Sequence, residues 1–347
     1  MRRWSIVIAF GVAVAVMVSG CSVIDDDLSD CGEELELDYD LHLVTNMSIE
    51  LQNELDRKAD ANLLKALRDY LAPVFTDYAH DLDLSFYDTQ GDSAQLHHER
   101  HIMDANELSY KLYLPRRYYM HTAVANVEDN KSVSYEGMER CHQASFRQAA
   151  TDTIVTHKTG LFTARQPMQL SGGASKTFFI HLYMANCAAA LVLDTSAASF
   201  SGIKVVSTGF ASRFNIADST YVYAANPPIV KTDRIETGSD GQLCFCTVNF
   251  PSQELSAVAT RNIIETEAPF VSLDGDRALW QFRVYVTLPD GKVTESILGV
   301  RKPLRAGQLK IIRARVYANG GLEPDDQNVG VSVTLDWNEA GHHHVPL

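Results

Sequence analysis

Alternation of apolar and polar residues dominates the chain from residue 35 onwards. In the first such segment, five apolar residues occupy every second position: Leu35, Leu37, Tyr39, Leu41 and Leu43. Acidic residues and one histidine separate them, and a period of two places the apolar side chains on one face of a strand. The same alternation returns at 82–87 and 110–127. The pattern therefore predicts a half-buried strand in each segment.

A different period interrupts these strands before Pro73. Leucines recur there at spacings of three, four and seven, with Glu, Lys and Arg between them: Leu51, Leu55, Leu63, Leu64, Leu67 and Leu71. This spacing is typical of one face of a helix. It predicts one helix, or two short ones, inserted into the sheet.

The second half of the chain repeats the strand pattern without a helix. Strand-like runs occur at 178–193, 203–207, 243–248, 279–288, 293–300, 309–317 and 329–337. Pro289 and Gly291 mark a hairpin turn, because proline fixes φ and glycine accepts a positive φ. Many short strands separated by turns favour β-sandwiches. We predict an all-β fold with a helical insertion and two tandem sandwich domains, 35–172 and 173–347, divided near the small residues Ser171–Ala174.

The first twenty residues form a targeting segment. Two arginines precede an apolar run from Ile6 to Val18, which is short for a permanent membrane span. The run ends in Val18-Ser19-Gly20-Cys21 and resembles the bacterial lipobox. That resemblance implies cleavage between Gly20 and Cys21 and a diacylated Cys21 as the new N-terminus. A plain secretory signal with a chance cysteine is the alternative.

An acidic tether, 21–34, follows the lipobox. Asp25, Asp26 and Asp27 are expected to stay solvated, because carboxylates gain nothing by packing on anionic lipid. The three acids resemble the export signal that directs Bacteroidota lipoproteins to the outer face of the outer membrane. An ordinary solvated linker is the alternative.

Five cysteines remain after the lipobox: Cys31, Cys141, Cys187, Cys244 and Cys246. In an oxidising compartment they can form disulfides, although an odd number leaves one thiol free. We expect Cys31 to pair with Cys141, and Cys187 to pair with Cys244 or Cys246. Buried free thiols that pack as small apolar residues are the alternative.

The composition argues against several functions. The net charge is −14, or −16 without the first twenty residues, which hold two arginines and no acid. Nucleic acids and anionic membrane surfaces are therefore disfavoured partners. The cluster His97-His98-Glu99-Arg100-His101 fails the spacing of a zinc-protease helix, so we interpret it as a solvated loop and predict no metal site. No serine-hydrolase elbow, dinucleotide fingerprint or phosphate loop occurs, and we expect neither catalysis, a cofactor nor a small-molecule substrate.

One segment carries a more specific resemblance. Asp27-Leu28-Ser29-Asp30-Cys31, which ends ten residues after the lipobox cysteine, resembles the N-terminus of FimB-type fimbrial anchor lipoproteins of Bacteroidales. The resemblance continues through 112–119, 123–126 and Leu161-Phe162, although Arg116-Arg117 stands where that family commonly has Pro or Gly. It implies two transthyretin-like sandwiches and a place at the base of a cell-surface fimbria. It also implies fimbrial stalk subunits as partners, joined by strand donation.

The distribution of basic residues distinguishes an anchor from a polymer subunit. The resemblance implies that polymer subunits lose their lipidated N-terminus and first strand to a protease that cuts after Arg or Lys. Between Cys21 and Asn53 this chain has no Lys or Arg, and the first is Arg57. The protein should therefore keep its lipid and its first strand, and should donate a strand rather than accept one.

The terminal run is the natural donor, because a clean apolar row suits β-augmentation. Its row consists of Val329, Val331, Val333, Leu335 and Trp337. The alternative is that this run closes the sandwich of its own chain.

A surface glycan-binding lipoprotein is the second function that the sequence permits. Such proteins are also acidic and lipidated, but sugar platforms usually need exposed aromatic rings. After the signal segment the chain has only Trp280 and Trp337, both within strand-like runs. This lowers the rank of the glycan-binding interpretation.

The lipid attachment can be tested directly. Cys21→Ala should leave an unprocessed precursor or a released soluble protein, because two or three acyl chains hold a protein on a bilayer and none would remain. Acyl labelling and membrane fractionation measure both effects. Unchanged fractionation, with no acyl label on the natural protein, would contradict the assignment.

Overall fold

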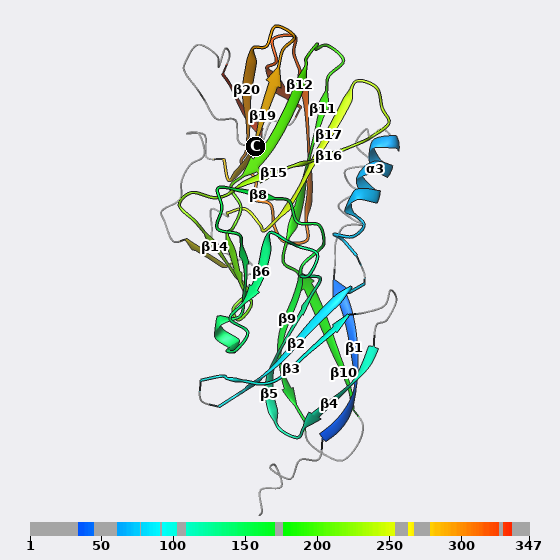
Figure 1. Cartoon of the computed structure of the whole chain (residues 1–347), viewed down its shortest axis with the longest axis vertical. Helices are drawn as coiled ribbons and strands as arrows, with labels where there is room; N and C mark the ends of the chain where they lie inside the picture. Colours follow the sequence, from blue (N-terminus) through cyan, green and yellow to red (C-terminus); the bar gives the residue numbers. More distant parts are fainter. Residues whose placement is uncertain are drawn as a thin grey trace, which may run out of the picture.

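The structure is a computed structural model, and it describes residues 34–44, 61–76, 78–90, 92–102, 109–170, 176–253, 263–266, 278–325 and 329–334. Within these ranges the chain forms four sheets and one α-helix. Figure 1 shows a long molecule with the N-terminal sheet at one end and two packed sheets at the other. The expectation of an all-β fold with a helical insertion is confirmed at this level.

In the seven-stranded N-terminal sheet, the first strand of the chain lies second from one edge. Its order is β3 (Gln95–Ile102), β2 (Asp81–Asp88), β5 (Tyr118–Ala125), β9 (Phe162–Gln169), β10 (Lys176–Met184), β1 (Glu34–Val44) and β4 (Ser109–Pro115). The strands expected at 35–43, 82–87 and 110–127 are thus confirmed, the last as the two strands β4 and β5.

Two further sheets pack face to face at the other end of the molecule. The inner sheet has the order β16 (Asp233–Ile235), β17 (Gln242–Asn249), β11 (Cys187–Asp194), β21 (Leu309–Val316) and β22 (Leu322–Pro324). The outer sheet has the order β23 (Val329–Thr334), β20 (Val293–Val300), β19 (Trp280–Thr287), β12 (Gly202–Thr208), β15 (Ile229–Lys231) and β8 (Thr153–Val155). Apolar side chains from both sheets form one core between them, including Leu191, Ile312, Phe282 and Leu298.

A fourth sheet, the side sheet, lies against the middle of the molecule (Figure 1). Its order is β18 (Ile263–Thr266), β14 (Thr220–Tyr223), β13 (Arg213–Asn215), β7 (Ser145–Gln148) and β6 (Val133–Glu136). A short 3-10 helix, Cys141–Gln143, precedes β7. Phe146, Phe214 and Tyr221 fill its small core.

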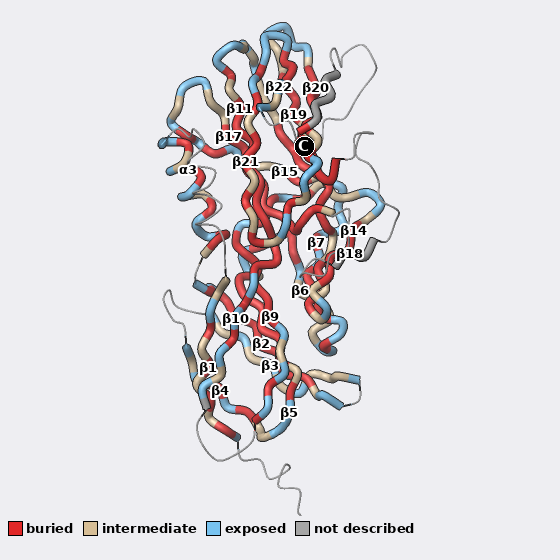
Figure 2. The backbone as a smooth tube through the Cα atoms, turned by 180° about the vertical axis from the view of Figure 1, so that it is seen from behind, coloured by how far each residue is buried: buried red, intermediate tan, exposed pale blue. Residues whose placement is uncertain are grey.

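The helix α3 (Ala61–Leu71) covers the inner sheet from the side opposite the outer sheet. Its buried residues Leu63, Leu67 and Leu71 join the same core as Val192 of β11 and Val248 of β17. This core continues into the N-terminal sheet, and Figure 2 shows buried backbone running between the two regions. The inner sheet is therefore buried on both faces, which is why every residue from Cys187 to Leu193 is buried and the run shows no alternation.

The chain does not change sheets where the sequence suggested a domain boundary. β9 and β10 flank the expected division at 172–173, and they pair with each other in the N-terminal sheet (Tyr183 opposite Thr163). The transfer to the inner sheet occurs at Ala185-Asn186, which splits the run 178–193 into β10 and β11. Moreover, β7 and β8 from the first half pair with β13 and β15 from the second. The two halves therefore share sheets.

Two glycines provide a matched test of how closely the chain at residue 209 packs against Trp280 of β19. Gly209 has a φ of +101°, and a Cβ there would lie 2.7 Å from the Cα of Trp280. Gly209→Ala should lower the free energy of unfolding by about 3 kcal/mol, because backbone strain and a clash with a buried strand add together. Gly291, in the hairpin turn, has a φ of +85° and open space around it. Gly291→Ala should cost only about 1 kcal/mol. Urea unfolding measures both, and equal losses would contradict the close packing at Gly209.

Candidate assembly site

The first strand is held from both sides. β1 pairs in parallel with β10, from Leu37 opposite Lys176 to Val44 opposite Tyr183. On its other side it pairs antiparallel with β4, from Glu34 opposite Pro115 to Asp40 opposite Ser109. Its apolar row is buried: Leu35, Leu37, Tyr39 and Leu41. Removal of β1 would separate β4 from β10 and open the core of the N-terminal sheet.

A buried hydrogen bond fixes β1 to the far side of that core. The Tyr39 hydroxyl donates to Nε2 of His121 on β5 at 2.5 Å, and Nδ1–H of His121 donates to the Ser85 carbonyl at 3.1 Å. This assigns the proton of the neutral ring to Nδ1. Burial lowers the pKa of His121 to about 3, and burial raises the pKa of Tyr39 well above its ordinary value. Both groups therefore stay neutral, and the pair is satisfied without a charge in the core.

The histidine cluster lies on a strand, so its interpretation as a solvated loop is wrong. Because β3 has a period of two, His97, Glu99 and His101 share one face, and His98 lies on the other. Nε2 of His97 and Nε2 of His101 lie 2.7 and 2.8 Å from the two carboxylate oxygens of Glu99. No set of three or more metal-binding side chains occurs among the described residues. Partly buried polar groups on an edge strand discourage pairing with foreign strands.

The described cysteines are buried and carry free thiols: Cys141, Cys187, Cys244 and Cys246. Cys187 faces the core between the inner and outer sheets, whereas Cys244 and Cys246 face the core beneath α3. The expected bond between Cys187 and either of them is not formed, because the side chains lie on opposite faces of one sheet. Burial raises the pKa of the Cys187 and Cys246 thiols, so they pack as small apolar residues. Cys31, the expected partner of Cys141, lies outside the described residues.

The proposed N-terminal signals also lie outside the described residues. These are Gly20 and Cys21 at the cleavage and lipid site and Asp25, Asp26 and Asp27 in the tether. Their roles stay predictions. Within the described ranges, no helix has the length and apolarity needed to cross a membrane.

The structure places the start of the expected donor segment in the chain's own outer sheet. β23 pairs antiparallel with β20, from Val329 opposite Val300 through Val331 opposite Leu298 to Val333 opposite Ser296. Among the described strands it has this one neighbour, so it is an edge strand. For residues 329–334 this arrangement matches the alternative of a closing strand, whereas Leu335 and Trp337 lie outside the described residues. Donation by this segment stays a prediction.

Sequence reasoning missed the partners that hold β1. β10 lies more than 130 residues further along the chain, and His121 follows Tyr39 by 82 residues. The alternation at β1 indicated which face is buried, but no local signal names the strands on either side.

The structure shows whether one of the two tryptophans after the signal segment is exposed. Trp280 is fully buried, and its Nε1–H donates to the Lys302 carbonyl. Trp280 is therefore no sugar platform.

Comparison with known proteins finds similarity in structure only. No family description matches the sequence, and no curated protein matches it either. A proposed adhesin from Bacteroides thetaiotaomicron has a TM-score of 0.49 and 11% identity, covering 87% of this chain and 97% of its own. The fimbrial anchor protein Mfa2 from Porphyromonas gingivalis has a TM-score of 0.44 and 10% identity, covering 88% and 99%. The tip fimbrial protein Mfa3 from the same organism has a TM-score of 0.42 and 11% identity, covering 88% and 100%.

The burial of His121 predicts that the free energy of unfolding depends on pH. Its pKa is about 3 in the folded protein and about 6.5 in an unfolded chain, so below pH 6.5 the unfolded state binds a proton that the folded state does not. The contribution of the neutral His121 ring to the free energy of unfolding is complete above pH 6.5, and it is lost as the pH falls towards 3. His121→Gln should reduce the slope of unfolding free energy against pH by about 1.4 kcal/mol per pH unit between pH 6 and 4.

Urea unfolding at a series of pH values measures this slope. The control is His142→Gln, because His142 is exposed in the folded protein. An unchanged slope in the His121 variant would contradict a neutral buried ring.

Proposed function

We propose that this protein is a lipid-anchored cell-surface fimbrial subunit that holds a fimbria at its base. In this proposal Cys21 carries the lipid, the acidic tether directs the protein to the outer face of the outer membrane, and the folded chain binds the first stalk subunit. In this proposal the protein is not an enzyme.

The observation that supports the anchor role is the combination of an interior β1 with the absence of basic residues before it. A protease that cuts after Arg or Lys has no site between Cys21 and Asn53. Buried side chains and pairing on both sides hold β1 in place. The chain therefore keeps its lipid, and no groove is left open at β1 for a donated strand.

The contact with the stalk is proposed to use the C-terminal segment from Val329 to Trp337 as a donated strand. Since β23 is an edge strand, it pairs on one side only, so its departure exchanges the pairing with β20 and withdraws Val329 from the core between the two sheets. Main-chain hydrogen bonds would then be replaced one for one, and the alternating apolar row would fill pockets of the partner. An interior strand could not leave at so low a cost.

A reversible cross-link tests whether β23 must leave. Ser296 and Val333 are directly opposite each other, and opposed residues of antiparallel strands lie within reach of a disulfide. In a strain that lacks the natural protein, we expect the oxidised Ser296→Cys/Val333→Cys protein to stay folded and lipidated. Its fimbriae should be released into the medium, and reduction should restore their attachment.

The two single-cysteine variants are the matched controls, and both should hold fimbriae on the cell. Sedimentation of cells followed by immunoblotting for fimbriae measures attachment. Normal attachment by the oxidised double variant would refute donation by this strand. Normal attachment in the strain that lacks the protein altogether would refute the anchor role itself.

A further inference from the structure

The lower end of the molecule in Figure 1 is formed by the start of β1, the end of β4 and the start of β5. Glu34, the first residue of β1, is directly opposite Pro115, the last residue of β4. Two residues, Arg116 and Arg117, connect Pro115 to Tyr118 at the start of β5. Because β4 and β5 are not neighbours in the sheet, this connection, the arginine turn, crosses from one part of the sheet to another. It lies beside the point where the first strand begins.

Two hydrogen bonds hold the backbone of the arginine turn. The Tyr119 hydroxyl donates to the Pro115 carbonyl at 2.9 Å, and the Leu170 amide donates to the Arg117 carbonyl at 3.0 Å. Tyr119 and Leu170 are themselves buried in the core of the N-terminal sheet. The turn is therefore fixed to that core, which lowers the entropic cost of a contact that it makes with another surface.

An exposed tyrosine lies on each side of the arginine turn. Tyr118 is 59% exposed and Tyr113 is 48% exposed. Their neighbours Leu114 and Tyr119 are buried in the core, so the alternation of the strands directs both tyrosines outward. A tyrosine ring has an apolar body and a polar tip, and it suits the boundary between lipid and water. This end of the molecule thus presents two rings that suit a bilayer surface.

The charge at this end differs from that of the whole chain. Arg117 is 46% exposed and lies 3.9 Å from Asp88. An exposed ion pair contributes little to stability, so its guanidinium group can turn to another anion at little cost. Four basic and three acidic residues lie on the segments that meet here: Lys111, Arg116, Arg117 and Lys176, and Glu34, Glu36 and Asp88. The net charge of −14 that disfavours an anionic membrane therefore does not describe this end.

The lipid of the proposed function would be attached close to the arginine turn. Only residues 22–33 separate Cys21 from Glu34, and even a fully extended chain of that length spans about 45 Å. A short tether gives the turn an effective concentration in the millimolar range at the bilayer, so that weak contacts are occupied. In Figure 1, β20, the neighbour of the proposed donor strand β23, lies at the upper end. A membrane contact at the lower end leaves that strand accessible to a stalk subunit.

We propose that the arginine turn and its two flanking tyrosines dock on anionic phospholipid headgroups of the membrane that holds the lipid. This inference rests on the lipid attachment in the proposed function and adds an orientation to it. The guanidinium group of Arg117 binds a headgroup phosphate, and Arg116 adds positive charge beside it. The rings of Tyr113 and Tyr118 lie in the interfacial layer. The long axis of the molecule then points away from the membrane.

Hydroxyl-radical footprinting of the full-length lipidated protein tests this contact. The protein is placed in nanodiscs that contain phosphatidylglycerol, an anionic lipid, and in nanodiscs of phosphatidylcholine alone, and mass spectrometry measures the oxidation of each tyrosine. We expect the oxidation of Tyr113 and Tyr118 to be about fivefold lower in the anionic discs. Tyr183, at the other end of β10, and Tyr317, after β21, are internal controls, because they are 46% and 41% exposed. Their oxidation should be the same in both discs.

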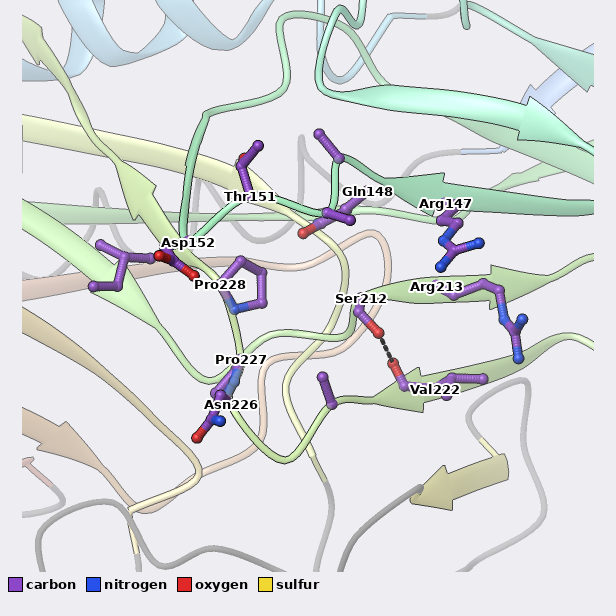
Figure 3. A pocket seen from close by; sticks show the side chains of 14 residues that line it. Arg147, Gln148, Thr151, Asp152, Ser212, Arg213, Val222, Asn226, Pro227 and Pro228 are labelled. Carbon is purple, nitrogen blue, oxygen red and sulfur yellow. Dashed lines mark hydrogen bonds between the residues drawn. The ribbon is translucent and has the colours of Figure 1, made fainter.

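A pair of arginine variants assigns the contact to the turn. Arg117→Gln should raise the oxidation of Tyr118 in anionic discs about threefold, since a charge-assisted bond to phosphate is lost. Arg147→Gln is the matched control, because Arg147 is 54% exposed and lies 3.8 Å from Glu136. Figure 3 shows Arg147 at a pocket beside the side sheet, away from the lower end. This control should keep the oxidation pattern of the natural protein, and both variants should melt at its temperature.

Three results would overturn the proposal. Equal oxidation of Tyr113 and Tyr118 in the two kinds of disc, with the protein bound to both, would refute the docking and leave the lipid anchor standing. An equal fall at Tyr183 and Tyr317 would show general shielding of the protein in place of a contact at the lower end. A protein that enters neither disc carries no lipid, which would refute the proposed function and the docking together.

Discussion

The double pairing of β1 is the constraint on which the rest of the N-terminal sheet depends. β4 reaches the sheet only through β1, and β10 has β1 as one of its two neighbours. The Tyr39–His121 hydrogen bond adds a contact across the core to β5. The first strand therefore connects the edge of the sheet, its interior and the opposite wall of the core. Removal of β1 would also expose apolar side chains of the core to water, which costs free energy.

The inner sheet lies between the two largest hydrophobic cores of the described residues and contributes side chains to both. It is covered by the outer sheet on one face and by α3 with the N-terminal core on the other. The strand β11 consequently has no polar face, and its small residues Ala188, Ala189 and Ala190 allow close packing on both sides. A separate pair of sandwiches would have left one face of this sheet to solvent. The two halves thus share strands and a hydrophobic core.

Sequence patterns located many strands well, including β2 and β19, which are buried along nearly their whole length. β1 and the β19–β20 hairpin follow directly from alternation and from the Pro289–Gly291 turn. The patterns failed where one apolar run holds strands of two different sheets, or where pairing partners are distant in the sequence. The run 178–193 gave no sign of the break at Ala185, and the polar cluster on β3 looked like a loop. Arg147 and Arg213 are 66 positions apart, so their juxtaposition depends on a register that no local pattern encodes.

The direction of β1 has a mechanical consequence. β1 runs parallel to β10 and antiparallel to β4, with seven or more residue pairs on each side. A pull applied to the chain at residue 34, along the strand axis, loads these hydrogen bonds in shear, so that they resist together instead of opening one after another. The buried Tyr39 side chain, bonded across the core, lies in the path of that sliding motion. Tension from the N-terminus is thus shared among the hydrogen bonds that join β1 to β10 and to β4.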